Sequence, residues 1–471
     1  MAYDYDLITI GLGPAGMAVS IMGSEMGLTV CAIEKHKVGG ECMNVGCIPS
    51  KSLVRMAKTR SLFDKLDKME LAETPKPAVK TPFQRIQTHL DFISRQKTMK
   101  MFDKVDMVYQ QGPATFVDSN TVEVGGKKYT AKRIFICAGT RPDVPSFPGI
   151  EGVDYLTNEN MFALETIPES LIVTGGGAIA CEMAQAFARL GSKVTIIIRG
   201  PRLMWREDQD ATDILEATFE HEGIEIVREQ KPARFEQRDR RVALHTDKGA
   251  ELVAEKVLLA AGRKMDYAQL RLDRAGVAVD HRGAISVNKH LQTGQRHIYA
   301  VGDCNGHAQL THAAMHQGMI ALMNSMSPGP FKRDFRKFAV PWTVFTEPQF
   351  SHVGLRETDL QSQGINYEVI RVNYGDYGAA IAEAVDVGFV KAFVSPTGRI
   401  HGAYIIGEGS GEMINEWALA VQKKLRIHNI MMLQHSFPTM GFLSKRVAET
   451  WMMNRMKSKK MKSLCRFMFR L

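Results

Sequence analysis

The chain of 471 residues is too long for one hydrophobic core, so two or three domains are expected. Hydrophobic residues make up 45% of it and charged residues 24%, which is ordinary for a globular protein and excludes a disordered or fibrous one. The net charge of +9 comes mostly from seven lysines and arginines after residue 453, and the remaining charge of about +2 gives no indication of nucleic-acid binding.

The N-terminal stretch MAYDYDLITIGLGPAG places acidic residues before a short apolar run, which is the wrong order for a signal peptide. No apolar stretch reaches the roughly eighteen residues that a membrane-spanning helix needs. The seven cysteines are odd in number and lack the dense spacing of a secreted disulfide-rich protein. We therefore expect a cytoplasmic protein.

Residues 5–35 have the pattern of a strand, a glycine turn, a helix and a second strand that ends at Glu34. In such a unit Gly11, Gly13 and Gly16 let backbone amides and the helix N-terminus approach a pyrophosphate. Glu34 would accept hydrogen bonds from the ribose hydroxyls of the same nucleotide. A generic βαβ turn is the alternative, because a lone glycine fingerprint is weak evidence.

A second unit of the same kind covers residues 170–200, and two units in one chain predict two nucleotide cofactors. It departs from the first at Ala180, in the third glycine position, and at Arg199, where an acidic residue would stand. An acid there would repel a 2′-phosphate, whereas a guanidinium binds it with two hydrogen bonds, so Arg199 favours NADPH over NADH. A solvated basic loop is the alternative. The candidate NADPH-binding residues are Gly175, Gly177, Ala180, Arg199, Arg202, Arg206 and, in a later AAGR motif, Gly262.

The stretch GGECMNVGCIPSKSL, residues 39–53, places Cys42 and Cys47 in a glycine-rich turn that opens a helix. The helix dipole and Lys51 favour a thiolate there. A zinc site is disfavoured because no second cysteine pair follows at zinc spacing, and inert buried cysteines are the other alternative. The stretch resembles the redox-active disulfide of the FAD-dependent pyridine nucleotide-disulfide oxidoreductases, which include dihydrolipoamide dehydrogenase, glutathione reductase and mercuric reductase.

This resemblance covers nearly the whole chain, through the ordered motifs GLGPAG, GPATF, ICAGTRP, GGGAIACE, AAGR, YAVGD, LTHAAMHQG and VFTEPQFSHVG. It implies an α/β fold with two Rossmann-like dinucleotide-binding domains and a C-terminal α+β dimerisation domain. The expected boundaries are 1–149 with 270–335 for the FAD-binding domain, 150–269 for the NAD(P)H-binding domain, 336–450 for the dimerisation domain and 451–471 for a basic tail.

The resemblance also implies roles for single residues. Cys47 would face the flavin, and Cys42 would meet the substrate. Lys51 and Glu182 match the pair beside flavin N5, where hydride arrives, although either alone could be an ordinary surface charge. Asp303 would hold the ribityl and phosphate side of FAD. The candidate FAD-binding residues are Gly11, Gly13, Gly16, Glu34, Lys51, Ala114, Gly139, Asp303 and Thr311, and the candidate catalytic residues are Cys42, Cys47, Lys51 and Glu182.

In the family, the C-terminal domain carries HPT followed by a glutamate, and in the dimer this histidine is the acid and base at the partner's disulfide. Alignment on the Pro-Thr pair at 438 places Phe437 at the histidine and Phe442 at the glutamate. Exchange with an external disulfide needs a proton donor and acceptor, so we expect it to be slower by ~10²- to 10⁴-fold. We interpret His435 as structural, with rescue of the missing base as the alternative.

We therefore expect a homodimeric flavoprotein in which NADPH reduces FAD and FAD reduces the Cys42-Cys47 disulfide. The dithiol would pass electrons to an acceptor that needs no histidine, such as the soft metal ion Hg(II) or a thioether or thiol substrate. No resident metal is expected. The alternatives are a dihydrolipoamide dehydrogenase-like disulfide reductase of low activity, an enzyme like 2-ketopropyl-coenzyme M oxidoreductase/carboxylase, which has Phe at the same position, and a redox-sensing flavin-binding protein.

From Trp451 onward the chain has the pattern of a basic amphipathic helix rich in Met and Phe, which would contact an anionic membrane surface. A solvated basic helix is the alternative. Cys465 lies in this tail as a single thiol, whereas mercuric reductase ends in a cysteine pair that passes the metal ion inward. The shuttle analogy with that enzyme is therefore incomplete.

Overall fold

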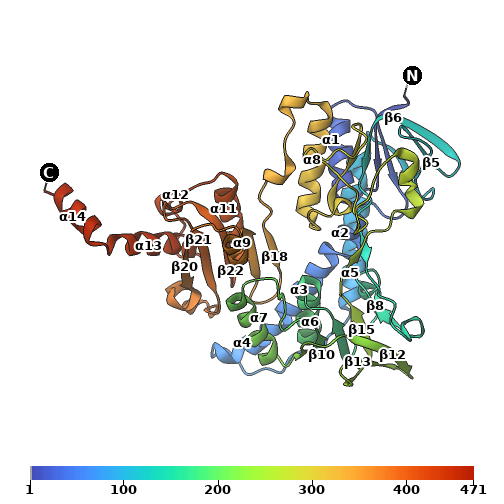
Figure 1. Cartoon of the computed structure of the whole chain (residues 1–471). Helices are drawn as coiled ribbons and strands as arrows, with labels where there is room; N and C mark the ends of the chain where they lie inside the picture. The colour runs from blue at the N-terminus through green and yellow to red at the C-terminus, as the bar shows by residue number, and fades with distance from the viewer. Residues whose placement is uncertain (1–2, 471) are drawn as a thin grey trace. The chain divides into compact units, whose positions relative to one another are not determined.

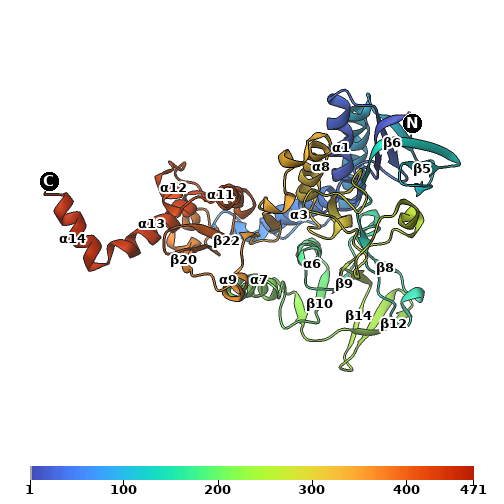
Figure 2. The same cartoon turned by 45° about the horizontal axis from the view of Figure 1, so that its top comes forward.

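A computed structural model describes residues 3–470 of the chain (Figures 1 and 2). These residues divide into two compact units. The first comprises the chain up to Gly175 together with Arg189–Lys193 and Pro232–Arg336, and the second comprises Gly176–Ala188, Val194–Lys231 and the chain from Lys337 onward.

The first unit is built on a mainly parallel sheet in the order β3-β2-β1-β6-β5-β4, with β17 beside β6. Strand β1 (Tyr5–Ile10) runs parallel to both β2 (Val30–Glu34) and β6 (Lys127–Ile136). Strand β2 is buried throughout, as are the last residues of β1 and β6, which is typical of a parallel sheet covered on both faces. Helices α1 and α8 lie side by side against one face (Figure 1). The remaining strands of this sheet are β3 (Asp106–Tyr109), β4 (Thr115–Phe116), β5 (Thr121–Val124) and β17 (Ile298–Ala300).

The described residues of the first unit also form several α-helices. They are α1 (Pro14–Glu25), α2 (Gly40–Asn44), α3 (Cys47–Ser61), α4 (Phe63–Lys68), α5 (Pro82–Ile93) and α8 (Thr311–Met326).

The first unit also contains strands outside this sheet, which lie between β6 and β17 in the chain. They are β7 (Arg141–Pro142), β8 (Tyr155–Leu156), β9 (Ser170–Thr174), β12 (Pro232–Arg238), β13 (Arg241–Thr246), β14 (Glu251–Ala254), β15 (Lys256–Leu259) and β16 (Arg263–Lys264). Strands β8 and β9 both run parallel to β15, and β12-β13-β14 form an antiparallel meander.

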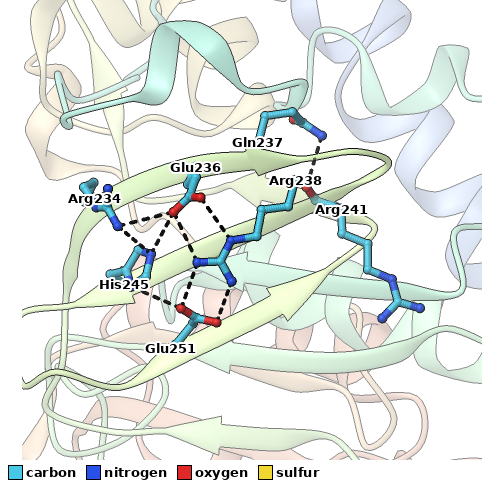
Figure 3. A network of polar contacts seen from close by, with 7 residues as sticks. All are labelled: Arg234, Glu236, Gln237, Arg238, Arg241, His245 and Glu251. Carbon is cyan, nitrogen blue, oxygen red and sulfur yellow. Dashed lines mark hydrogen bonds and ion pairs between the residues drawn. The ribbon is translucent and has the colours of Figure 1, made fainter.

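A network of charged side chains covers the exposed face of this meander (Figure 3). Arg238 binds Glu236 and Glu251 in ion pairs of 3.1 and 2.8 Å, and His245 lies between the same two carboxylates. Hydrogen bonds from Arg238 lower the pKa of both carboxyl groups below its ordinary value. Exposed pairs of this kind contribute little to stability, so we interpret the network as a solvated sheet face.

The second unit is built on an antiparallel sheet in the order β18-β19-β22-β21-β20. Its core is apolar and includes the fully buried Trp417. The elements after Lys337 are β18 (Trp342–Val344), β19 (Phe350–Gly354), α9 (Glu357–Ser362), β20 (Glu368–Asn373), α10 (Gly378–Ala382), β21 (Phe389–Val394), β22 (Ile400–Ile406), α11 (Ser410–Gln422), α12 (Ile427–Met432), α13 (Phe442–Met456) and α14 (Lys459–Met468). The elements from earlier in the chain are α6 (Ala178–Leu190), β10 (Lys193–Ile197), α7 (Gln209–His221) and β11 (Glu225–Val227).

Residues 150–269 are divided between the two compact units, and the predicted domain boundaries stay a prediction. The physical reason for this division is a set of bonds between α6, the start of α7 and the C-terminal sheet. Gln185 accepts a hydrogen bond from the Glu347 backbone N–H at 2.8 Å. The buried Lys391 of β21 pairs with Asp208 at 2.8 Å and with Asp210 at 2.6 Å.

The end of the C-terminal domain also differs from the prediction of a tail that begins at Trp451. Helix α13 continues to Met456, and Trp451 is buried in the apolar core of the second unit. Arg455 binds Glu368 at 2.6 Å and lies over the Trp451 ring. The sequence from Trp451 onward therefore belongs to two helices, α13 and α14. Trp451 packs into the apolar core of the second unit, whereas the residues of α14 are exposed.

Candidate active site

The turn after β1 is shaped for close approach of another group to its backbone. Gly11 has a φ of +92°, and a Cβ added to it would lie 2.6 Å from the Cys137 carbonyl oxygen. A Cβ on Gly16 would lie 1.9 Å from the Gly11 carbonyl oxygen, which no side chain tolerates. Helix α1 then begins at Pro14 without a side-chain cap at Gly13. The free amides of this N-terminus fit the pyrophosphate of a dinucleotide.

Glu34 lies at the end of β2 and is only 7% exposed. One carboxylate oxygen accepts a hydrogen bond from the Leu12 backbone N–H at 2.8 Å, and the other accepts one from the His36 N–H at 2.7 Å. Glu34 therefore holds the glycine turn against the end of β2, a role that the sequence prediction missed. Each oxygen retains a lone pair, so the predicted bond to a ribose hydroxyl stays a prediction.

The turn that carries the two cysteines, residues 39–47 (the redox turn), lies directly against the glycine turn of residues 11–16. Gly40 has a φ of +54°, and a Cβ added to it would lie 2.8 Å from the Cα atom of Gly13. Asn44 closes the turn by donating to the carbonyls of Val38 and Gly40 at 3.0 and 2.8 Å. Two glycines without side chains thus bring the cysteine pair next to the expected FAD pyrophosphate site.

Both cysteines of the pair are thiols in the structure and lie beside Thr311 at the start of α8. Cys42 is in α2, and Cys47 is the first residue of α3, with its Sγ 3.1 Å from the Thr311 hydroxyl oxygen. A hydrogen bond with Cys47, burial and the charge of Cys47 raise the pKa of Cys42 well above its ordinary value, while Thr311 and Lys51 oppose this shift. This shift favours the thiol form of Cys42, and the helix N-terminus favours negative charge on Cys47.

A polar chain centred on Arg263 lies beside the redox turn. Its Nε donates to the Thr140 hydroxyl at 2.6 Å, and its Nη2 pairs with Glu41, the residue before Cys42. Thr140 in turn donates to Asp303 at 3.2 Å. Burial raises the pKa of Glu41 and of Asp303, and Arg263 opposes both shifts. The sequence analysis missed Glu41, Thr140 and Arg263, because neighbours separated by 123 and 222 positions leave no local pattern.

The other candidate FAD residues occupy loops of the same unit. Ala114 is buried, Gly139 has a φ of +67° with open space where a Cβ would be, and Asp303 follows Gly302, which has a φ of +83°. Lys51 lies one turn after Cys47 on α3. The residues present therefore fit FAD, because a Cβ would fill the cradle at Gly11, Gly16 and Gly40.

The second glycine motif is split between the two units. Gly175 has a φ of +114°, and its Cβ would lie 2.5 Å from the Ala260 carbonyl oxygen in the first unit. Gly177 has open space around it, and Ala180 is fully buried on α6 in the second unit. Gly262 belongs to the first unit, where its carbonyl accepts a hydrogen bond from Asp143 N–H at 3.0 Å.

The three predicted phosphate-binding arginines have different surroundings. Arg202 is half-buried and donates to the carbonyls of Trp205 and Glu207, both at 3.1 Å, so it closes the loop around itself. Arg199 and Arg206 are exposed, and Arg206 lies over the ring of Trp205. Arg199 and Arg206 are thus accessible to an anionic ligand, whereas Arg202 bonds its own loop, and the binding of NADPH by all three stays a prediction.

Glu182, the predicted partner of Lys51, is buried on α6 and accepts a hydrogen bond from the Phe345 backbone N–H at 3.0 Å. Lys51 and Glu182 belong to different units, so their pairing beside the flavin stays a prediction.

Phe437 and Phe442, the positions predicted for the family's histidine and glutamate, form an aromatic cluster in the second unit. Phe437 is 71% exposed, and its ring lies 5.3 Å from that of Phe442, which stacks on Tyr377. His435 lies beside them, with Nε2 3.1 Å from a Glu416 carboxylate oxygen and Nδ1 3.3 Å from the Leu433 carbonyl oxygen. Both ring nitrogens thus have partners within the unit, which favours the structural interpretation of His435.

The model of the pyridine nucleotide-disulphide oxidoreductase family matches residues 5–318, and the model of the dimerisation domain of that family matches residues 340–445. The chain belongs to this family. It is therefore an enzyme of the flavoprotein disulfide oxidoreductase class, with FAD as the expected cofactor. The predicted α/β fold with a C-terminal dimerisation domain is confirmed.

Relatives of this chain differ in their named substrates. It is 31% identical over 447 residues to a mercuric reductase of Staphylococcus aureus, covering 91% of this chain and 79% of the relative. It is 32% identical over 449 residues to a dihydrolipoyl dehydrogenase of Thermus scotoductus, covering 93% and 95%. The HOCl-induced flavoprotein disulfide reductase RclA of Escherichia coli has a similar structure, with a TM-score of 0.85, 28% identity and coverage of 95% and 99%. The Cu(II) complex of RclA matches equally well.

Proposed function

We propose that this protein is an NADPH-dependent reductase that passes electrons through FAD and the Cys42-Cys47 pair to a thiophilic metal ion. The observation that carries the proposal is the contrast between the two ends of the electron path. The cysteine pair, Thr311 and the glycine cradle are complete, whereas phenylalanine occupies both positions of the family's proton-transferring dyad.

Bound FAD supplies the two-electron carrier between the nicotinamide and the disulfide. The chain's own residues then prepare the dithiol. Thr311 contacts Cys47, and the first turn of α3 favours negative charge on that sulfur. Cys42 remains protonated, so it attacks an external disulfide slowly unless a base removes its proton.

A thiophilic metal ion fits these conditions because it displaces thiol protons by forming metal–sulfur bonds, and two thiolates are soft ligands. Reduction of the metal then needs no protonation of a leaving thiolate. The names of the relatives support this acceptor class, since they include a mercuric reductase and a Cu(II) complex of a disulfide reductase.

We infer NADPH as the electron donor from the exposed Arg199 and Arg206, which present guanidinium groups where a 2′-phosphate would bind. Arg199 and Arg206 lie in one loop, and Arg202 holds this loop by donating hydrogen bonds to two of its carbonyls.

We infer a homodimer because each unit exposes an apolar surface. In the first unit, α3 and α5 form an open groove of about 200 Å³ whose lining is Ile48, Pro49, Ser52, Ile86, His89, Leu90, Phe92 and Ile93. In the second, Met432 and Phe437 are 74% and 71% exposed. A second copy of the chain would cover such surfaces, and the family's dimerisation domain supports this.

An anaerobic NADPH titration of the flavin, followed by an acceptor panel, tests the proposal. The panel comprises Hg(II), Cu(II), oxidised lipoamide, glutathione disulfide, and 2-ketopropyl-coenzyme M with CO₂. We expect full flavin reduction and turnover with a metal ion that exceeds turnover with either disulfide. Fast reduction of lipoamide or glutathione disulfide would favour the disulfide reductase alternative, and flavin that NADPH does not reduce would favour a sensor.

The double variant Phe437→His with Phe442→Glu isolates the role of the missing dyad. We expect disulfide reduction to rise by ~10²-fold or more, because a positioned acid-base group typically contributes that much. Phe437→Leu is the matched control, since it removes the ring without adding a base. An equal rise in the control would show that steric blockage, rather than proton transfer, limits the reaction.

A further inference from the structure

The last helix of the described chain, α14, has no role in the chemistry above. It begins after Ser458, whose side chain caps it by accepting a hydrogen bond from the Met461 backbone N–H at 3.2 Å. All of its residues are exposed. A helix of this length is marginal in water by itself, so its residues need a surface that stabilises them.

Helix α14 has two chemically distinct faces. Met461, Leu464, Cys465 and Met468 follow the i, i+3, i+4, i+7 spacing and form one apolar face. Lys459, Lys462 and Arg466 lie on the opposite face. Phe467 and Phe469, which are 62% and 96% exposed, flank the apolar face.

The charge around this helix has one sign. No Asp or Glu occurs after Glu449, whereas six Lys or Arg residues follow Met456. Arg455 is bound to Glu368 and belongs to the domain, but Lys457 and the residues of α14 extend beyond the C-terminal core. Figures 1 and 2 both show α14 leading away from α13 with no other element of its unit beside it.

We propose that α14 docks this reductase onto an anionic phospholipid surface, with its apolar face in the headgroup boundary and its lysines and arginines at the lipid phosphates. Among residues 3–470, no helix is long and apolar enough to cross a bilayer, so α14 would lie on the surface. Charge complementarity selects this partner, because a basic face beside a Met- and Phe-rich face matches a surface that is both anionic and apolar.

Pairing of two α14 helices with each other is disfavoured, because it would bring like charges together. A nucleic acid would use the basic face alone and leave Leu464 and Phe467 without a role. These two partners therefore predict different effects of substitutions on the apolar face.

Sedimentation with vesicles tests the proposal on the full chain with FAD bound. We expect binding to vesicles of phosphatidylcholine with phosphatidylglycerol, little binding to phosphatidylcholine alone, and release at high salt because Coulomb attraction is screened. Equal binding to both vesicles, or to neither, would overturn the proposal.

Three pairs of substitutions separate the faces. Leu464→Glu with Met468→Glu changes the apolar face, and Lys462→Glu with Arg466→Glu changes the basic face. Each pair should weaken vesicle binding by about tenfold or more, since each removes one of the two contributions. Arg240→Glu with Lys248→Glu is the charge-matched control at exposed positions of the first unit and should bind as the unchanged protein does. Binding that resists the apolar pair and is competed by duplex DNA would show a nucleic-acid site instead.

Cys465 provides a direct probe of the apolar face. In a Cys42→Ser, Cys47→Ser background it is the one exposed cysteine of the described chain, the remaining four being buried. Its modification by a water-soluble maleimide should slow severalfold on anionic vesicles and stay unchanged on zwitterionic ones. No protection on vesicles that bind the protein would exclude docking through this face. NADPH-dependent flavin reduction should be the same in the three paired variants, because α14 lies outside the redox site.

Discussion

The two glycine-rich nucleotide motifs of this protein, residues 5–35 and 170–200, share one sequence pattern but differ in the contacts that hold them in the structure. The first has no room for a Cβ at Gly16, and Glu34 ties its turn to the neighbouring strand through two backbone amides. The second accommodates the buried methyl group of Ala180 and ends in the exposed Arg199. In the first nucleotide motif the acidic residue is thus bonded to the motif's own backbone. In the second motif the residue at the matching position, Arg199, is exposed to a charged ligand.

The two nucleotide motifs also differ in what supports them. All parts of the first lie in one compact unit, whereas β9 and α6 of the second lie in different ones. The loop after β10 is anchored from the C-terminal sheet, where Lys391 pairs with Asp208 and the Tyr404 hydroxyl donates to Glu207 at 2.9 Å. Its position therefore depends on residues about 180 positions later in the chain.

The largest effect is expected for Gly16→Val in the first unit. Its side chain would overlap the Gly11 carbonyl oxygen, so the turn must open and the pyrophosphate cradle is lost. We expect purified protein with almost no flavin and no measurable turnover, since each hydrogen bond to a charged group contributes about 1.5–3 kcal/mol. The ratio of flavin absorbance to protein measures this. Full flavin content would show that the cradle is not the FAD site.

Lys391→Met tests the long-range support of the second unit. Removing one partner of a buried ion pair costs about 3–5 kcal/mol, because Asp208 is left without its cation. Burial already raises the pKa of Asp208, and Lys391 opposes that shift. The pKa in the variant is therefore higher still, so the stability deficit should grow as the pH rises and shrink toward acidic pH, where Asp208 is neutral.

Urea unfolding of the two proteins at pH 5 and pH 8 measures this deficit. Lys391→Arg, which keeps the charge, is the control and should recover part of the stability. A deficit that does not depend on pH would mean that lost packing against the Phe389 and Tyr404 rings dominates.

Arg199→Glu would give the second nucleotide motif the acidic residue that the first motif has at Glu34. Loss of a bidentate guanidinium contact costs about 1.4–2.8 kcal/mol, so kcat/KM for NADPH should fall about 10- to 100-fold while that for NADH holds or rises. Steady-state kinetics with both nucleotides measure the ratio. Arg241→Glu is the matched control, because the Arg241 side chain points away from the ion pairs on the β12-β13-β14 sheet (Figure 3). An unchanged preference in Arg199→Glu would leave the arginines as a solvated loop.

The smallest effect is expected for Ala180→Gly, which gives the second nucleotide motif the glycine that the first motif has at Gly16. The helix would lose about 1 kcal/mol through the lower propensity of glycine, and NADPH turnover should stay within about twofold. Thermal unfolding and steady-state kinetics check both values. A large loss of NADPH binding would mean that the Ala180 methyl group positions the turn.

Much of the flavin side of the molecule could be predicted from local patterns. The strand, turn, helix and strand of residues 5–34 appear where periodicity and glycine spacing indicate them, because each element depends on neighbours in the chain. The start of α3 at Cys47 follows from the same logic. The ion pair between Glu41 and Arg263 was not predicted, since 222 positions separate the two residues.

Residue type and spacing alone predicted the family, the two nucleotide motifs and the cysteine pair, and alignment on the Pro-Thr pair assigned Phe437 to the position of the family's histidine. The folded structure was needed to see that Glu34 holds the glycine turn, that Arg202 bonds carbonyls of its own loop while Arg199 and Arg206 are exposed, and that both nitrogens of His435 have partners. It also decided that Trp451 belongs to the core and α14 does not. The physical reason is that burial and hydrogen-bond partners depend on segments brought together by folding, which no local pattern records.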